Sequence, residues 1–380
     1  MAKKAYVYSG TDWVPLASEV TDLTPYQTIA NSQAPFRNLI INGAMQVAQR
    51  GTSTASITGS GFYTADRYYL VDNGLGTWTQ SLENDAPTGS GFVKSVKMLC
   101  TTADASPAAS DILFFRQSLE GQNLQSVRKG TADAQQLTMS FWVKSNVTGT
   151  YILSLLDADN TRQISASYTI DSSATWEKKT ITFPADTTGA FDNDNAASLR
   201  VDFWLATGSD FGGGTLNTSW GADVNANRAV GQTNLASATN NYWQITGVQL
   251  EVGPVATPFE FKPYAQDLLE CQRYYVKFPT IGTGNAPLVG FGMCNSNGTV
   301  ANIQIQLPTT MRSTPSAVET SSLRVNDVSN GYTISSPSLG NISTMNTGVI
   351  SWTVTGGPAY RSVFLDGTAS TAYVAFSAEL

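Results

Sequence analysis

Apolar and polar residues alternate along several segments of the chain. This period of two is typical of β-strands that bury one face. In residues 137–144 every second side chain is apolar, namely Leu137, Met139, Phe141 and Val143. In residues 199–205 the polar Arg200 and Asp202 alternate with apolar neighbours, which puts them on the opposite face. Both segments are therefore predicted to be strands with an apolar inner face.

Further strand-like segments follow at similar spacing, with almost no helical period between them. Such spacing is typical of an antiparallel β-sandwich. A short helix is predicted near residues 117–124. Residues 207–241 form a long connection rich in Gly, Asn, Ser and Ala, and connections of this length are usually functional or mobile. The other predicted strands of this part are residues 151–156, 176–183 and 242–252, with a bulge at Gly247.

The pattern changes at residues 263–278, where Pro263 can open a helix and an apolar stripe of helical period follows. This stripe could form a three-fold seam between subunits or pack between two β domains. After Pro279 the chain returns to strand-like runs. The fold class is therefore all-β, with an antiparallel β-sandwich at residues 36–262 and a smaller C-terminal β domain, led by a short helix, at residues 263–380. The C-terminal strands are predicted at residues 301–307, 349–354 and 372–376.

Residues 1–35 form a third, separate segment. Two short strand-like runs, residues 4–8 and 13–16, are joined by turn-forming residues, so a β-hairpin is predicted. The polar stretch from residue 21 to residue 35 predicts a linker. A single hairpin is not stable alone in water, so we expect it to pack against another body.

Composition and charge exclude several classes of function. Only 13% of the 380 residues are charged, the net charge is −7, and histidine is absent. Nucleic acids and anionic membranes bind clustered Lys and Arg, so neither is a predicted partner. The lack of histidine removes the usual nucleophilic triads and most transition-metal sites, and no cofactor is predicted. No apolar run is long enough to insert into a membrane and no signal peptide is recognised, so we expect a soluble protein made in a cytosol.

Several short motifs carry a resemblance to a known group of proteins. Residues 246–253, TGVQLEVG, are the most specific, together with residues 257–260 and 271–275. The sequence NLIINGAMQVAQRG at residues 38–51 and ADRY at residues 65–68 accompany them. These stretches resemble the core domain of phage tail fibre proteins, which itself resembles a carbohydrate-binding-module jelly roll. Residues 6–16, 308–315 and 376–380 are also similar to elements of phage fibres.

The resemblance covers most of the chain in order, and it implies a virion structural or receptor-binding protein, usually a trimer. It implies a jelly-roll topology for the sandwich. Related jelly rolls often carry an acidic residue in the segment that matches residues 42–45, where this chain has Ala44. This departure argues against a structural calcium site of that kind, and no metal site is predicted.

Aromatic side chains in loops are the candidate glycan-binding residues, because sugar rings stack on aromatic rings beside amides and carboxylates. Trp220 and Phe211 lie in the long connection, and Trp78 follows a Gly-containing loop. The alternative is that these three rings hold their loops against the sandwich or a neighbouring subunit.

Carboxylates offer two further hypotheses. Residues 157–160 and 192–195 have closely spaced oxygen ligands that calcium accepts, but turn formation explains the same residues and is preferred. Asp202 and Glu251 could face one another across a sheet as a glycosidase pair. Sequence gives no separation for them, and we expect no enzymatic activity.

The sequence thus predicts a non-catalytic bacteriophage fibre or adhesin that resides on the virion. Residues 1–35, with Tyr6, Tyr8 and Trp13, are predicted to attach it to a tail adaptor or nozzle or to a capsid protein. A homotrimer would contact a host cell-surface glycan and gain avidity from its three copies. The alternatives are a capsid-bound decoration fibre with a structural role and a glycan-degrading tailspike.

Overall fold

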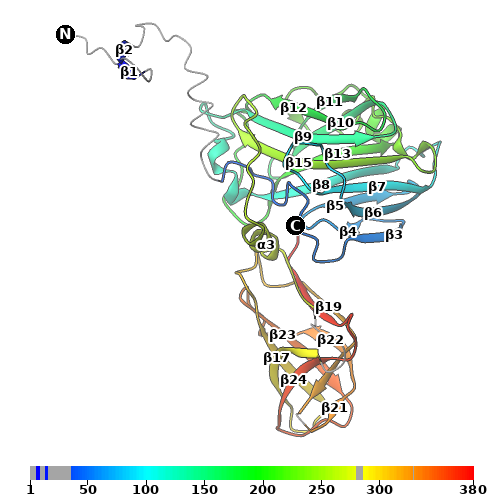
Figure 1. Ribbon diagram of the computed structural model, residues 1–380, viewed down its shortest axis with the longest axis vertical. Helices are drawn as coiled ribbons and strands as arrows, with labels where there is room; N and C mark the ends of the chain where they lie inside the picture. Colours follow the sequence, from blue (N-terminus) through cyan, green and yellow to red (C-terminus); the bar gives the residue numbers. More distant parts are fainter. Residues whose placement is uncertain (1–5, 9–12, 16–35, 280–285, 328) are drawn as a thin grey trace.

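The computed structural model describes residues 6–8, 13–15, 36–279, 286–327 and 329–380. A two-sheet sandwich is followed by a helix and by a smaller group of strands, and the C-terminus returns to the helix (Figure 1). Strand pairing is antiparallel in every sheet that these residues form. The predicted fold class, an all-β jelly-roll sandwich with a smaller helix-led β part, is confirmed.

Two sheets make up the sandwich, and they are named sheet I and sheet II here. Sheet I has the strand order β14 (Gly221–Ala222), β11 (Arg162–Ile170), β10 (Gly149–Asp157), β13 (Ala197–Thr207), β8 (Ile112–Glu120), β5 (Tyr69–Asn73), β4 (Gly61–Phe62). Sheet II has the order β12 (Glu177–Phe183), β9 (Leu137–Ser145), β15 (Tyr242–Val252), β7 (Ser95–Thr102), β6 (Thr77–Glu83), β3 (Ser53–Ile57).

The main core lies between these two sheets, and the alternating residues fill it as predicted. All four apolar residues of the 137–144 run belong to this core, as do Val201 and Phe203. Their neighbours Arg200 and Asp202 therefore point to the outer face of sheet I. The bulge in β15 is also confirmed, because Gly247 has a φ of +62° and the pairing with β9 shifts there. The period of two thus fixed both the strands and the face that each one buries.

The helix predicted near residues 117–124 is found only as a short 3₁₀ turn at residues 121–123, and residues 117–120 belong to strand β8. Strand β8 continues to Glu120 because Leu113, Phe115 and Leu119 keep the period of two and pack into the core. The strand is followed by the 3₁₀ turns η1 (Gly121–Asn123) and η2 (Gln125–Val127).

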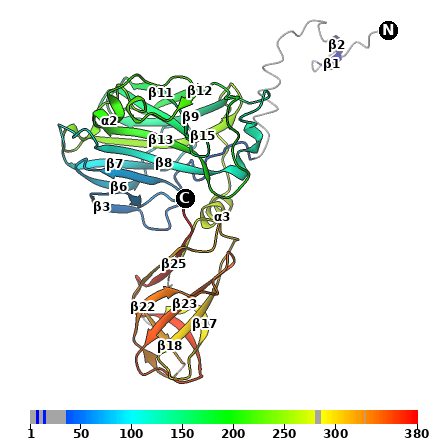
Figure 2. The ribbon, with the colours of Figure 1, turned by 180° about the vertical axis from the view of Figure 1, so that it is seen from behind.

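The long connection between β13 and β15 carries short elements rather than open loop. Phe211 and Ala229 of this connection pack with Trp204 on the outer face of sheet I, whereas Leu235 and Ala236 join the main core (Figure 2). The elements are α2 (Ser209–Gly212), η3 (Asn225–Asn227) and η4 (Leu235–Ser237), in addition to β14.

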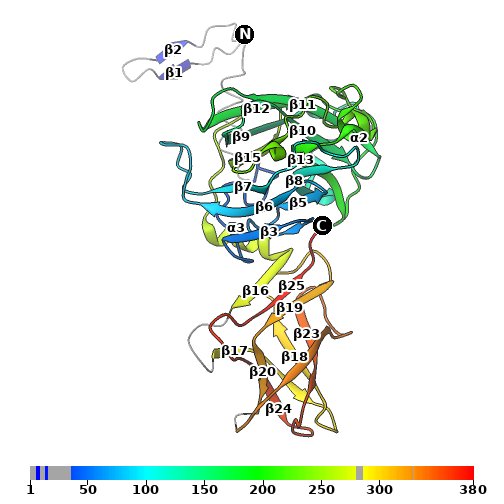
Figure 3. The same ribbon diagram turned by 90° about the vertical axis from the view of Figure 1, so that its right-hand side faces the viewer.

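The C-terminal strands surround a second core of their own. Helix α3 (Tyr264–Gln272) precedes them, directly after Pro263 as predicted, and lies between the sandwich and these strands (Figure 3). Sheet III is β16 (Tyr275–Pro279), β25 (Tyr373–Ser377), β19 (Ala317–Ser321). Sheet IV is a nearly closed barrel in the order β21 (Gly331–Tyr332), β20 (Leu323–Asn326), β24 (Ser362–Gly367), β17 (Ala286–Cys294), β18 (Val300–Gln306), β23 (Thr347–Val354), β22 (Ile334–Leu339).

The predicted N-terminal hairpin has its two strands in place. Strand β1 (Tyr6–Tyr8) pairs antiparallel with β2 (Trp13–Pro15). The rest of residues 1–35, and the side chains of Tyr6, Tyr8 and Trp13, lie outside the described part of the chain. Neither helix in the described ranges combines the length and the apolar character that crossing a bilayer requires.

Candidate functional site

The segment that enters the sandwich is held against its last strand. The amide of Asn38 donates to the carbonyl of Val248 at 3.2 Å, and its Oδ1 accepts from the backbone N–H of Leu250 at 3.1 Å. Glu260 accepts from the backbone N–H of Asn38 at 2.8 Å. A Cβ on Gly43 would lie 2.1 Å from the carbonyl oxygen of Val248, so only glycine permits this close approach. Residues from both ends of the sandwich therefore form one joint.

The C-terminal end of the chain enters the same joint. Arg67, only 1% exposed, donates to the Glu379 carboxylate at 2.5 Å, and its guanidinium lies 3.4 Å from the centre of the Tyr274 ring. Gln49 donates to the carbonyl of Tyr275 at 2.7 Å. Because these contacts join the sandwich, the end of α3 and the last residues of the chain, they hold the two cores together.

Glu120 is a second buried carboxylate of this joint. Its Oε1 accepts from Nε of Arg273 at 2.8 Å and from the hydroxyl of Tyr274, and its Oε2 accepts from Nη2 of Arg273 at 2.7 Å. Burial alone would raise the pKa of Glu120, but the hydrogen bonds from Arg273 and Tyr274 outweigh it and lower that pKa. The carboxylate is therefore held ionised, and it ties the end of β8 to the residues that follow α3.

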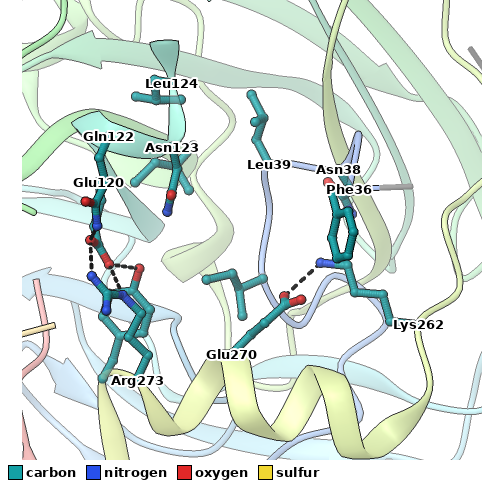
Figure 4. A pocket seen from close by; sticks show the side chains of 13 residues that line it. Phe36, Asn38, Leu39, Glu120, Gln122, Asn123, Leu124, Lys262, Glu270 and Arg273 are labelled. Carbon is teal, nitrogen blue, oxygen red and sulfur yellow. Dashed lines mark hydrogen bonds and ion pairs between the residues drawn. The ribbon is translucent and has the colours of Figure 1, made fainter. Parts of the chain in front are cut away.

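A pocket of about 360 Å³ lies beside this ion pair, between α3 and the sandwich (Figure 4). Leu39 and Leu124 line its apolar side. Its charged groups are already paired, because Arg273 binds Glu120 and Lys262 binds Glu270 at 2.7 Å. The charged side chains that line the pocket are therefore paired with one another.

Five of the motifs that resemble phage fibres meet at this joint, although they are far apart in the sequence. Each contributes a residue to the contacts above: Asn38 from residues 38–51, Arg67 from residues 65–68, Val248 from residues 246–253, Glu260 from residues 257–260, and Tyr274 from residues 271–275. The motifs therefore describe a structural joint. Sequence reasoning gave their order along the chain but not their convergence.

The prediction that Trp78 contacts a glycan is wrong. Trp78 is fully buried in the main core, and its indole N–H donates to the carbonyl of Leu75 at 2.5 Å. It pairs across the strands with Cys100, which is also fully buried. A ring without exposed surface cannot stack on a sugar. The neighbouring Gly-containing loop suggested an exposed position, but β6 begins one residue earlier and turns the ring inward.

Phe211 and Trp220 are both half-buried and pack on different elements. Phe211 lies 5.9 Å from the ring of Trp204, in a small cluster on the outer face of sheet I. Trp220 donates its indole N–H to the carbonyl of Pro184 at 2.9 Å and lies 5.3 Å from the ammonium of Lys129. These contacts hold the long connection to the sandwich, and the structure does not bring the two rings into one site.

The two strand carboxylates do not form a glycosidase pair. Asp202 points to the outer face of sheet I, whereas Glu251 alternates with the core residue Leu250 and points to the outer face of sheet II. They therefore lie on opposite sides of the sandwich.

Asp157 accepts from the backbone N–H groups of Asp159 and Asn160, which is the turn chemistry preferred above. Within the described ranges, no three His, Cys, Asp or Glu side chains gather in a metal-binding arrangement.

Arginines collect around Asp202 on the outer face of sheet I. Asp202 is fully buried and accepts two hydrogen bonds from Arg116, at 2.6 and 2.8 Å, and one from Arg228 at 2.7 Å. Burial alone would raise the pKa of Asp202, but the adjacent Arg116 and Arg228 hold it below the usual value. Both carboxylate oxygens are thus occupied by arginines from β8 and from the long connection.

A half-exposed surface borders this cluster. We name it the arginine face and define it by Tyr69, Arg116, Arg200 and Asp223. Tyr69 pairs across the strands with Arg116, and Arg200 lies two residues from Asp202 on the same face of β13. The strand pattern had placed Arg200 and Asp202 outside the core. However, sequence reasoning missed the site, since its members come from four separate segments.

Asp72 is a second buried carboxylate with a shifted pKa. It is 5% exposed, and its Oδ1 accepts from the backbone N–H of Leu75 at 3.3 Å. Burial, and then the nearby charge of Asp111, raise the pKa of Asp72 from 3.8 to about 6, against the opposing effect of the Leu75 hydrogen bond. The folded protein therefore holds this proton more tightly than the unfolded chain does. The carboxyl group of Asp72 therefore lowers the free energy of unfolding progressively as the pH rises from about 4 to above 6.

We expect Asp72→Asn to stabilise the protein at pH 7 by about 1–3 kcal/mol, because the amide avoids the cost of a buried charge and keeps an oxygen for Leu75. The gain should vanish near pH 4, where the carboxyl is already protonated. Thermal unfolding at both pH values measures the difference. The matched control is the exposed Asp133→Asn, which should change little. Equal effects of Asp72→Asn at both pH values would contradict the raised pKa.

The similarity of this chain to known proteins is low. No protein-family model matches the sequence, and no curated protein matches it significantly. The enzymatically active domain of tailspike protein 4 from bacteriophage CBA120 is 14% identical over 58% of this chain, with a TM-score of 0.31, and the match spans 22% of the tailspike chain. A family 4 carbohydrate-binding module is 11% identical over 56% of this chain and 97% of its own, with a TM-score of 0.28. The family 11 module of Clostridium thermocellum, in complex with a mixed-linked tetrasaccharide, is 11% identical over 54% of this chain and 98% of its own, with a TM-score of 0.27. The fold assignment rests on the sheets described above.

Proposed function

We propose that this protein is a fibre or adhesin of a bacteriophage particle that contacts a host-surface glycan without cleaving it. The observation that carries the glycan contact is the arginine face, where an accessible guanidinium, a carboxylate and a phenol lie together. Sugar hydroxyls both donate and accept hydrogen bonds, so planar polar groups beside an aromatic ring suit them. The virion role is supported by the resemblance to phage fibres, whose motifs make up the joint.

We further propose a homotrimer in which residues 1–35 attach to the particle through Tyr6, Tyr8 and Trp13. Large apolar side chains exposed at α3 and near it support a contact between copies, because association would remove their apolar surface from water. These side chains are Phe36 (69% exposed), Phe261 (50%), Tyr264 (54%) and Leu269 (47%). The location on the virion follows from this proposal.

Retention on immobilised bacterial surface polysaccharides tests the proposed function. We expect the full chain to be retained on a subset of polysaccharides and to release no new reducing ends from them. Failure to be retained on any of a broad panel would overturn the glycan contact. Release of reducing ends would replace the proposal with the tailspike alternative.

The other alternative is a decoration fibre bound to the capsid. The two virion proposals differ in what residues 1–35 bind, a tail adaptor or nozzle in one case and the capsid lattice in the other. A decoration fibre would also lack retention on polysaccharides, because its role would be structural.

A further inference from the structure

The arginine face has an arginine that none of the described residues pairs. Arg116 and Arg228 both bind Asp202, whereas Arg200 has no hydrogen bond or ion pair to the described residues. Arg200 is half-buried, and burial together with the neighbouring Arg116 lowers its pKa. The local charge is therefore positive, since three arginines face two carboxylates, Asp202 and Asp223.

Two buried polar atoms of the same sheet face also lack a partner in the described part of the chain. Within the described residues, Nε of Arg228, which is 7% exposed, and Oε1 of Gln163, which is fully buried, have no hydrogen-bond partner. Gln163 and Arg200 lie in one row across sheet I, because both pair with Leu156 of β10. A buried polar atom without a partner costs about 1–3 kcal/mol. The network is thus incomplete around Arg200, as expected where a polar ligand or its water completes it.

Asp223 supplies the complementary acceptor. It lies directly after β14, its charge acts on both Arg116 and Arg200, and its buried Oδ1 has no hydrogen-bond partner among the described residues. A carboxylate needs a donor from the ligand, whereas Arg200 needs an acceptor. The pair therefore favours an anion that also carries hydroxyl groups.

We propose that the arginine face binds an acidic sugar of the host glycan, with the sugar carboxylate on Arg200 and sugar hydroxyls on Asp223. This inference rests on the proposed glycan contact and names its chemical class. One carboxylate balances the single excess positive charge, and a guanidinium binds a carboxylate with two parallel hydrogen bonds. The ring of Tyr69 lies at the border of the same surface and offers an apolar edge for the sugar.

Equilibrium binding of small acidic sugars tests the proposal. The probes are D-glucuronate, D-galacturonate and N-acetylneuraminate, each with its methyl ester, and inorganic phosphate, measured by chemical shifts on the full chain. We expect at least one acid to bind, and its methyl ester to bind about 10- to 100-fold more weakly, which corresponds to losing a charged hydrogen bond. Arg200→Ala should weaken binding of the acid by a similar factor, and Arg200→Lys should weaken it less.

The matched control is Arg128→Ala, which removes the same charge from an exposed arginine after η2. It should leave binding unchanged. The proposal would be overturned if acid and ester bound equally, if phosphate bound as tightly as the sugar, or if no acid bound. If Arg200→Ala stays on a polysaccharide that retains the wild-type chain, this inference fails while the proposed function stands. If the wild-type chain is retained on none, the proposed function itself fails.

Discussion

Replacing Glu120 with alanine is expected to destabilise the protein by about 3–5 kcal/mol and to loosen the C-terminal strands from the sandwich. Glu120 is fully buried and accepts hydrogen bonds from Arg273 and Tyr274. Removing it leaves a partly buried guanidinium and a buried phenol without their acceptor. Since both residues follow α3, the loss falls on the joint between the two cores.

Chemical unfolding together with limited proteolysis near α3 measures this effect. The matched control is Glu270→Ala, which breaks the ion pair with Lys262 at a more exposed carboxylate, 25% accessible, and should cost less than about 1 kcal/mol. A Glu120→Ala variant as stable and as protease-resistant as the Glu270→Ala variant would show that the buried ion pair does not hold the joint.

The second large effect is expected at Asp202. Asp202→Asn removes the negative charge that Arg116 and Arg228 both bind, and it turns an amide N–H₂ group toward arginine N–H donors. We expect a loss of about 3–5 kcal/mol, because removing one partner leaves uncompensated buried charge. Salt screens charges that are exposed to solvent. High salt should therefore reduce this loss only as far as the two arginines are exposed.

A double-mutant cycle with Arg228→Met separates the charge effect from simple loss of packing. If Asp202 acts by pairing, Asp202→Asn should cost less in the Arg228→Met background than in the wild type. The control is Asp210→Asn on α2. Asp210 is an exposed aspartate of the long connection between β13 and β15, and its substitution should leave stability unchanged. Strictly additive effects of Asp202→Asn and Arg228→Met would contradict the pairing.

Local patterns in the sequence predicted part of the strands. The alternation in residues 137–144 and 199–205 gave β9, β13 and their buried faces, and Gly247 gave the bulge of β15. Pro263 marked the start of α3. These features could be predicted because they depend on backbone conformation and on side-chain period, which neighbouring residues set.

Tertiary structure alone determined which residues meet. Trp78 was assigned to a loop surface because its flanking glycines are turn residues, yet its strand faces the core between sheets I and II. Asp202 and Glu251 have the same strand pattern but occupy opposite faces of the sandwich. The joint and the arginine face each combine residues separated by more than a hundred positions. Their assembly depends on strand order and register, which follow from non-local pairing and are not encoded in any one segment.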